Sequence, residues 1–305
     1  MRFRESIPTI SSLKKELISH TFPFVNIQTV KEKSTIKVQK SSGEKVNFSL
    51  PKLKKSLRHS GASEKDIQQI IDIVRDELYQ GISTREIYNR AFVLLKKKKS
   101  IFASKYKLKK AIYELGPTGF PFEHFIAEIL GHSGFQVAVG QYVQGKCVTH
   151  EIDVVAIKNT KKLFIECKFH GEEGRNCDVK IPLYIHSRYN DITTTQSQEY
   201  EYEGWVVTNT RFTSDAIQYG KCAQLYLLSW DFPKGNGLKD RIDRIGLYPI
   251  TVSTLLSNRE KVFLLDRGIV LCKQLLKAVF YLDHLGISEG RKEQITNEIK
   301  LLCNA

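Results

Sequence analysis

His150-Glu-Ile-Asp-Val-Val-Ala-Ile157 and Leu163-Phe-Ile-Glu-Cys-Lys168 are two apolar runs separated by a short turn. Runs of this length and composition predict two adjacent β-strands. The uninterrupted apolar stretch from Val154 to Ile157 indicates a strand that is covered on both faces of its sheet. Side chains two residues apart share one face of a strand, so Glu166 and Lys168 should project together while Cys167 points to the opposite side.

The charged residues of these runs predict phosphodiester hydrolysis. Asp153 on the neighbouring strand completes a carboxylate pair with Glu166, and two close carboxylates repel each other unless a cation holds them. Mg²⁺ prefers a few oxygen ligands with room left for water and phosphate. We therefore expect Asp153 and Glu166 to bind Mg²⁺, and Lys168 to orient the attacking water or to neutralise developing charge.

A structural interpretation of the same residues remains open. Asp153 would then cap a strand end, and Glu166 and Lys168 would form a surface ion pair. Because charge inside an apolar run is costly without a purpose, the positions of these residues favour the active-site interpretation.

The flanking sequence predicts an α/β or mixed α+β domain around this pair of strands. Gly116-Pro-Thr-Gly119 is the clearest break in the chain, and an amphipathic helix should follow it. Its apolar stripe consists of Phe122, Phe125, Ile126, Ile129 and Leu130. Further strands are expected at residues 136–143, 205–208 and 225–228, with a helix at 214–219 before the last one.

Residues 119–231 resemble the PD-(D/E)XK nuclease superfamily, and in particular Mrr-type restriction endonucleases. The resemblance rests on the helix FEHFIAEIL (122–130), the turn into GFQVAV (134–139), the strands EIDVVAI (151–157) and FIECK (164–168), and the run GWVVTNTRFTSDAI (204–217). It implies that the metal-binding acids are Asp153 and Glu166, and that the catalytic lysine is Lys168.

The resemblance also bears on Glu123. Glu123 matches an acid in the first helix that supports the site in many members, although it flanks the apolar stripe and suits an ordinary solvated position equally well. His150 precedes the metal-binding strand, where a histidine is more often structural. The segment QYVQGKCVTH (141–150) replaces the glycine-rich loop of Mrr-type proteins, which puts the substrate preference in doubt more than the cleavage chemistry.

The N-terminal part of the chain predicts a small hairpin followed by helices. Alternating residues at 36–39 and 46–48 flank a turn at Ser41-Ser-Gly43, and Pro51 suits the first turn of a helix. Ser63 with Asp66, and Ser83 with Glu86, predict the caps of two more helices. Residues 1–33 have weak periodicity and indicate an arm or linker with one short helix near Ser12 to Ser19.

Residues 35–113 resemble an ATP-cone, a regulatory nucleotide-binding domain. The motifs IKVQKSSGEKVNFSLPKLKKSL (36–57) and LYQGISTREI (78–87) carry the resemblance. It implies ATP or dATP as a regulatory ligand, with the nucleotide site lined by Val38, Lys40, Lys52 and Thr84. Lysines near a glycine turn and a helix N-terminus can hold a triphosphate through charge and backbone donors.

Alternative roles for these residues remain open. Val38 would belong to the core, Lys40 and Lys52 would face solvent, and Thr84 would belong to a helix cap. Ser41 stands where the family often has an arginine, so affinity or base choice is expected to differ. The sequence has no Walker-type Gly-x-x-x-x-Gly-Lys-Ser/Thr motif, so nothing indicates ATP hydrolysis by a P-loop.

The net charge of +14 lies entirely in the first part of the chain. Residues 1–116 hold 25 Lys and Arg against 11 Asp and Glu, whereas residues 117–305 hold 22 of each. Because basic surfaces attract polyanions, DNA and a nucleoside triphosphate are the expected partners. The clusters Lys96 to Lys99 and Lys105 to Lys110 favour this view over a merely solubilising surface.

Cysteine usage and hydropathy predict a cytoplasmic protein. The six cysteines show neither a Cys-x-x-Cys pair nor zinc-type spacing and indicate reduced, mostly buried thiols. Charged residues interrupt the most apolar stretch, 268–285, so no membrane span is expected. The N-terminus has no apolar segment typical of a secretory signal.

The predicted organisation has four parts. They are an arm at 1–33, an ATP-cone-like domain at 34–116, a restriction-endonuclease-like domain at 117–235 and a helical region at 236–305. In the last part a helix is expected through Ile269, Leu275 and Val279, and another over 289–302. The leading hypothesis is a Mg²⁺-dependent DNA endonuclease regulated by ATP or dATP. A nucleotide-responsive DNA-binding regulator with an inactive nuclease fold and an RNA-directed enzyme or toxin remain alternatives, and a homo-oligomer is left open.

Overall fold

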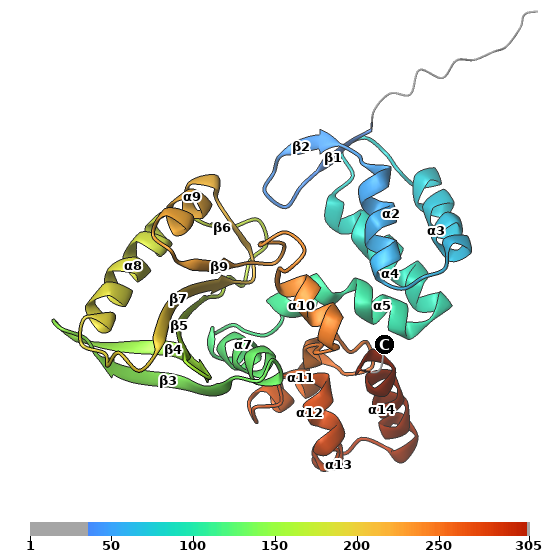
Figure 1. The fold of residues 1–305 in the computed structure, drawn as a ribbon. Coiled ribbons are helices and arrows are strands. Elements are labelled where there is room, and N and C mark those ends of the chain that lie inside the picture. The colour runs from blue at the N-terminus through green and yellow to red at the C-terminus, as the bar shows by residue number, and fades with distance from the viewer. Residues whose placement is uncertain (1–35, 304–305) are drawn as a thin grey trace, which may run out of the picture. The chain divides into compact units, whose positions relative to one another are not determined.

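The two apolar runs form adjacent strands of a five-stranded sheet in the computed structural model, which describes residues 36–303 (Figure 1). β4 (Thr149–Lys158) and β5 (Lys161–Lys168) are antiparallel, with Val154 opposite Ile165. The other strands are β3 (Gln136–Gln144), β7 (Glu201–Thr208) and β9 (Tyr226–Leu228). Their order is β3-β4-β5-β7-β9, and β7 and β9 run parallel to β5. The predicted mixed sheet is therefore confirmed.

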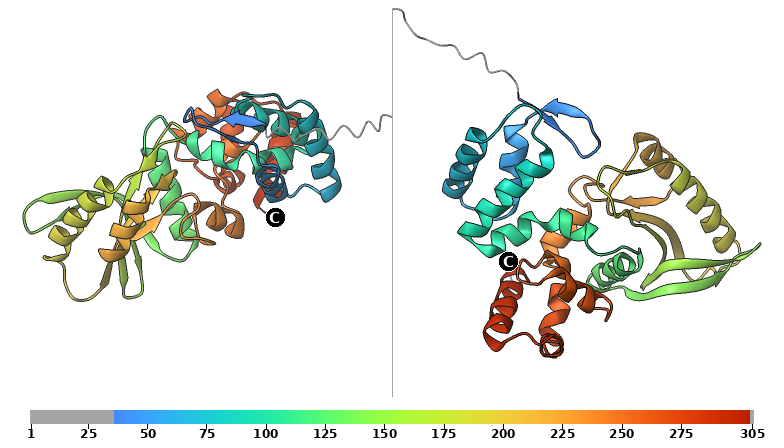
Figure 2. Two further views of the ribbon diagram at one scale, coloured as in Figure 1. Left: turned by 90° about the horizontal axis from the view of Figure 1, so that it is seen from above. Right: turned by 180° about the vertical axis from the view of Figure 1, so that it is seen from behind.

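Helices cover both faces of this sheet. α7 (Phe120–His132) lies on one face, and α8 (Lys180–Thr193) and α9 (Ser214–Cys222) lie on the other (Figures 1 and 2). Val154 packs into the core that contains α7, whereas its neighbour Val155 packs into a separate cluster with Ile192 of α8. Burial on both sides accounts for the uninterrupted apolar run of β4.

A short parallel pair of strands lies next to this sheet. β6 (Asn176–Cys177) pairs with β8 (Arg211–Phe212). Thr213 then caps α9, because its side chain accepts a hydrogen bond from the backbone N–H of Ala216 at 3.2 Å. The Phe-Thr part of the GWVVTNTRFTSDAI run thus ends a strand and begins a helix.

The N-terminal part forms the predicted hairpin and helices. β1 (Lys37–Gln39) and β2 (Lys45–Asn47) are antiparallel, and Gly43 adopts a φ of +82° in the turn. The helices are α2 (Leu50–His59), α3 (Glu64–Asp76), α4 (Thr84–Lys98), α5 (Ser100–Tyr106) and α6 (Leu108–Tyr113). Ser63 and Ser83 cap α3 and α4 as expected. The predicted arm at 1–33, with its short helix, lies outside the described residues.

The C-terminal part is helical, as predicted. Its elements are α10 (Leu238–Ile245), the 3₁₀ turn η1 (Ile250–Val252), α11 (Asn258–Leu265), α12 (Cys272–Lys277), α13 (Phe280–His284) and α14 (Glu289–Cys303). The helix expected to run through Ile269 and Val279 is wrong in its extent. Leu271 is extended and Ala278 has non-helical angles, so only residues 272–277 are helical there.

One hydrophobic core joins the last helix of the N-terminal part to the rest. Ala111 and Ile112 of α6 pack in the same cluster as Phe122 of α7 and Ile299 of α14. The helices before α6 have a core of their own around Ile67 and Leu95. The described residues from Ile36 onward accordingly form one compact unit, and the boundaries proposed at 34, 117 and 236 stay a prediction.

The cysteines agree only in part with the expectation of mostly buried thiols. All six are unpaired; Cys167, Cys177 and Cys272 are buried, whereas Cys147 and Cys222 are exposed and Cys303 is partly exposed. None of the helices in residues 36–303 combines the length and apolar character needed to cross a bilayer.

Candidate active site

Asp153 lies at the point where β4 and β5 separate. The paired ladder between these strands extends as far as Val154 opposite Ile165. Beyond this pair a side chain replaces the backbone as the acceptor: Asp153 Oδ2 accepts a hydrogen bond from the backbone N–H of Cys167 at 2.6 Å. This contact fixes the carboxylate beside the end of β5 that carries Glu166 and Lys168.

Glu166 and Lys168 interact on one face of β5, as the strand periodicity predicts. Lys168 Nζ donates to Glu166 Oε1 at 2.5 Å. The Glu166 residue is only 7% exposed, whereas 31% of the Lys168 side chain reaches solvent. Burial opposes the charge of Lys168, but the bond to Glu166 prevails and raises the pKa of the lysine. The ammonium group is therefore held charged at the edge of the site.

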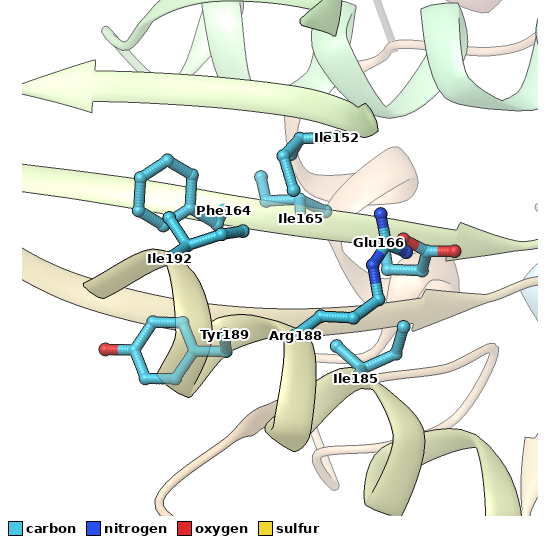
Figure 3. Close-up of a pocket in the computed structure, with 8 residues that line it drawn as sticks. All are labelled: Ile152, Phe164, Ile165, Glu166, Ile185, Arg188, Tyr189 and Ile192. Carbon is cyan, nitrogen blue, oxygen red and sulfur yellow. Dashed lines mark hydrogen bonds and ion pairs between the residues drawn. The ribbon is translucent and has the colours of Figure 1, made fainter. Parts of the chain in front are cut away.

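Arg188 is a third charged contact that the sequence analysis missed. It lies on α8, and its Nη1 donates to Glu166 Oε2 at 2.6 Å (Figure 3). Its Nη2 also donates to the backbone carbonyl of Glu151 on β4. Both oxygens of Glu166 thus face a cation, and Arg188 connects α8 to the two strands of the site.

Glu123 belongs to the same electrostatic environment. It lies in the first turn of α7 and is half-buried, and burial together with the charges of Asp153 and Glu166 raises its pKa to about 7. Burial and the charge of Glu166 likewise raise the pKa of Asp153 to about 6. Such shifts result when carboxylates lie close together with little solvent between them.

His150 and the Val-Thr-Asn segment support the surrounding backbone. His150 pairs through Nε2 with Asp191 Oδ2 of α8 at 2.8 Å, away from the Glu166 carboxylate. Asp191 also accepts the backbone N–H of Cys147 at 2.9 Å. Asn209 holds the backbone of His170 on both sides, by accepting from its N–H at 2.9 Å and donating to its carbonyl at 2.8 Å. These contacts fix the strand ends on either side of the site.

A narrow apolar pocket adjoins Glu166 between β5 and α8. Ile152, Ile165, Ile185 and Tyr189 line it together with the Glu166–Arg188 pair (Figure 3). Apolar walls lower the local dielectric constant and strengthen the electrostatic interactions of the charged groups that they enclose. Its small size suits the packing of side chains better than the binding of a substrate.

The donor set fits a divalent cation that keeps most of its water. Within residues 36–303, no three His, Cys, Asp or Glu side chains are grouped as a complete protein cage for a metal. Asp153 and Glu166 nevertheless offer carboxylate oxygens whose mutual repulsion a cation would relieve, and Mg²⁺ commonly binds through one or two carboxylates plus water and phosphate.

The four residues expected at a nucleotide site have different surroundings. Val38 is 3% exposed and packs in the core of the N-terminal helices. Lys40 is exposed and pairs with Glu44 at 2.8 Å. Thr84 begins α4 directly after Ser83, which forms a bridge with Gln39 of β1. Lys52 is exposed in the first turn of α2. The hairpin thus brings Lys40 near Thr84, whereas no hydrogen bond or ion pair joins Lys52 to either residue.

Comparisons with known proteins agree with this fold. Residues 117–231 match the family described as restriction endonuclease (Mrr_cat), and residues 248–303 match the family AF1548-like, C-terminal. A protein from Archaeoglobus fulgidus described as uncharacterized is 32% identical over 177 residues, which are 57% of this chain and 98% of the relative. The crystal structure of AF1548, a protein of unknown function, aligns with a TM-score of 0.51 at 28% identity over 62% of this chain and all of the other.

The match to Mrr_cat, together with the mixed sheet, shows that residues 117–231 form a restriction-endonuclease-like domain of the PD-(D/E)XK-like type. The chain belongs to the same family as the Archaeoglobus fulgidus protein, with an AF1548-like C-terminal domain after the nuclease-type domain. Residues 36–116 lie outside both matched segments.

Proposed function

We propose that this protein is a metal-dependent endonuclease that hydrolyses phosphodiester bonds in DNA in the cytoplasm, with a role in restriction or defence. The observation that carries the proposal is the contact of Lys168 with the buried Glu166 next to Asp153, at the point where β4 and β5 separate. A buried carboxylate between two cations is costly as a purely structural feature. Its position at the end of β5 in a restriction-endonuclease-like fold supports a role for this carboxylate as a metal ligand.

Asp153 and Glu166 would hold the Mg²⁺ ion, which supplies polarisation of the phosphoryl oxygen and a more acidic bound water. The residues of the chain have separate tasks. Lys168 Nζ, at the exposed edge, neutralises charge that develops on the phosphate. Arg188 keeps the Glu166 carboxylate in place from the α8 side. Glu123, half-buried in the first turn of α7, lies in the field of the two acids and supports the site from the α7 side.

The test is cleavage of DNA by the full chain with Mg²⁺, by Asp153→Ala and by Glu166→Ala. Each change removes an expected ligand and little apolar packing, so activity should fall more than about a hundredfold, as when one preorganised electrostatic group is lost. Glu201→Ala is the matched control, because Glu201 is an exposed acid at the opposite end of the same sheet. Undiminished cleavage by either site variant would refute the assignment.

A nucleotide-responsive regulator with an inactive nuclease fold is the competing function. The presence of all three groups, Asp153, Glu166 and Lys168, favours the enzyme, because a relic would be expected to lose at least one. An RNA substrate is tested in the same assay by replacing the DNA with RNA of the same sequence.

We further propose that ATP or dATP binding to the N-terminal helices regulates cleavage. The support is the resemblance to an ATP-cone together with the hairpin that brings Lys40 near the N-terminus of α4, where backbone donors and the helix dipole favour a phosphate. The excess positive charge of residues 1–116 favours a polyanionic ligand in this part of the chain.

A further inference from the structure

A second cavity, of about 320 Å³, lies between α4, the α5–α6 segment and the residues from Ser253 to Lys261. Four lysines line it, Lys96, Lys107, Lys110 and Lys261, and we call it the lysine pocket. Its volume lies at the lower end of the range for small-molecule sites. None of the residues assigned to the nuclease site or to the ATP-cone-like site lines it.

The lysines are arranged as a buried floor and an exposed rim. Lys107 and Lys261 are 9% and 5% exposed, whereas Lys96 and Lys110 are exposed to solvent. Buried lysines are rare unless each is paired with an acid. The floor of the pocket therefore holds positive charge away from water, and the rim adds more at the opening.

The pocket lining contains fewer carboxylates than lysines. Glu114 accepts from Lys107 at 2.6 Å and lies 3.9 Å from Lys261, so one carboxylate serves two buried ammonium groups. Glu298 lies behind the pocket, but its oxygens accept hydrogen bonds from Ser104, Ser253 and Thr254. Burial and the charge of Lys107 lower the pKa of Lys261. An anion in the pocket would reverse that effect.

Tyr88 adds an aromatic side chain to the same lining. Its hydroxyl is buried without a partner in the described residues. Its ring stacks on Tyr106 with 5.0 Å between centroids, and Phe92 lies beyond it at 6.2 Å. Because the hydroxyl has almost no accessible surface, Tyr88 meets the pocket with its ring, and the stacked rings give the pocket an aromatic side.

We propose that the lysine pocket binds the phosphate groups of a small phosphorylated ligand of nucleotide size. Lys107 and Lys261 hold the anion at the floor, Lys96 and Lys110 attract it at the rim, and Phe92 and Leu256 give an apolar wall for the rest of the molecule. Charge-assisted hydrogen bonds from several lysines to phosphate oxygens are strong and favour multiply charged anions. Because α4, α6 and the C-terminal region meet here, the ligand would stabilise their contact.

The test is calorimetric titration of the full chain with ATP, dATP and inorganic tripolyphosphate at fixed ionic strength. Lys261→Gln should weaken binding at least about tenfold, the effect of losing one hydrogen bond to a charged group. Lys97→Ala, at an exposed lysine of α4 outside the lining, should leave binding unchanged. Tighter binding of ATP than of tripolyphosphate identifies a nucleotide as the ligand, and equal binding identifies the phosphate chain alone; both support the pocket.

A double variant keeps the test valid if Lys261→Gln does not fold. Lys96→Ala with Lys110→Ala removes only exposed side chains and should also weaken binding about tenfold or more. The control Lys40→Ala with Lys52→Ala separates this pocket from the ATP-cone-like site, because tripolyphosphate binding should survive it. Unchanged affinity in the lysine-pocket variants, or binding of a DNA oligonucleotide with no binding of the small anions, would overturn the proposal.

Discussion

Arg188 on α8 donates to Glu166 on β5 at 2.6 Å, and Lys168 donates to the other oxygen of the same carboxylate. The two cations come from different elements, so the position of Glu166 depends on the packing of α8 against the sheet. The geometry of the site therefore depends on the contact between α8 and β5 as well as on the sequence of the FIECK strand.

Arg188→Ala should destabilise the metal-free protein by about 3–5 kcal/mol, because removing one partner of a buried pair leaves charge poorly compensated. Arg188→Lys should have a smaller effect because it keeps a positive charge beside Glu166. Some loss should remain, since an ammonium group cannot reach both Glu166 and the Glu151 carbonyl in the same fork geometry. Urea unfolding in the presence of a chelator measures both. Arg175→Ala is the control, because Arg175 pairs with Glu172 on the surface. Equal stability of Arg188→Ala and the control would contradict a structural role for the pair.

Lys168→Ala should abolish cleavage and retain Mg²⁺ binding, because the lysine is expected to act on the phosphate charge and is not a metal ligand. Its removal also frees Glu166 Oε1. Lys168→Arg should not restore full activity, since guanidinium is bulkier and presents its donors differently. Calorimetric titration with Mg²⁺ and a cleavage assay separate the two effects, with Lys161→Ala on the same strand as the control. Loss of Mg²⁺ binding in Lys168→Ala would assign the lysine a structural role.

Glu260→Gln should destabilise the C-terminal helices at neutral pH but not in acid. Bonds from Arg291 lower the pKa of Glu260 from 4.5 to about 2. A carboxylate with a lowered pKa stabilises the folded state fully above pH 4.5, and this contribution is lost as the pH falls through about 2. We expect a difference of about 1.5–3 kcal/mol at pH 7, as for a hydrogen bond to a charged group.

Urea unfolding of wild type and Glu260→Gln between pH 7 and pH 2 measures this difference. Glu289→Gln is the control, because Glu289 is 86% exposed where it meets Lys292. A constant difference between wild type and Glu260→Gln across the whole range would show that charge is not the cause.

The central strands and the contact of Glu166 with Lys168 could be predicted because their signals are local. Strand periodicity alone places residues 166 and 168 on one face. Arg188 could not be found in this way, since its contact spans 22 residues and α8 buries only Pro182, Ile185 and Ile192. Such a sparse apolar face gives a weak helical pattern.

The burial of individual lysines within a basic cluster could not be predicted from the sequence. Lys105 to Lys110 indicate an exposed basic surface, yet Lys107 is 9% exposed and bonds to Glu114 and to the carbonyl of Thr251. Thr251 is 144 residues away in the chain, so no local sequence pattern could predict this contact. The break of the C-terminal helix at Ala278 is also invisible to periodicity, because the apolar spacing continues across it.

The last prediction concerns coupling between the N-terminal helices and the nuclease site. A nucleotide can change cleavage only if it binds two states of the protein with different affinity. A physical route exists, because Ser104 of α5 bonds to Glu298 of α14 at 2.7 Å and α6 packs in the same core as α7. Typical coupling of about 1–3 kcal/mol corresponds to a 5- to 150-fold change in cleavage rate if it is fully expressed. Lys40→Ala with Lys52→Ala should weaken ATP or dATP binding at that site and remove this response, while basal cleavage stays within about twofold because neither lysine contacts Asp153, Glu166 or Lys168. Cleavage rates with and without nucleotide, measured beside binding, decide the matter: an unchanged affinity in the double variant refutes the site, and binding without any effect on cleavage or assembly refutes the regulatory role.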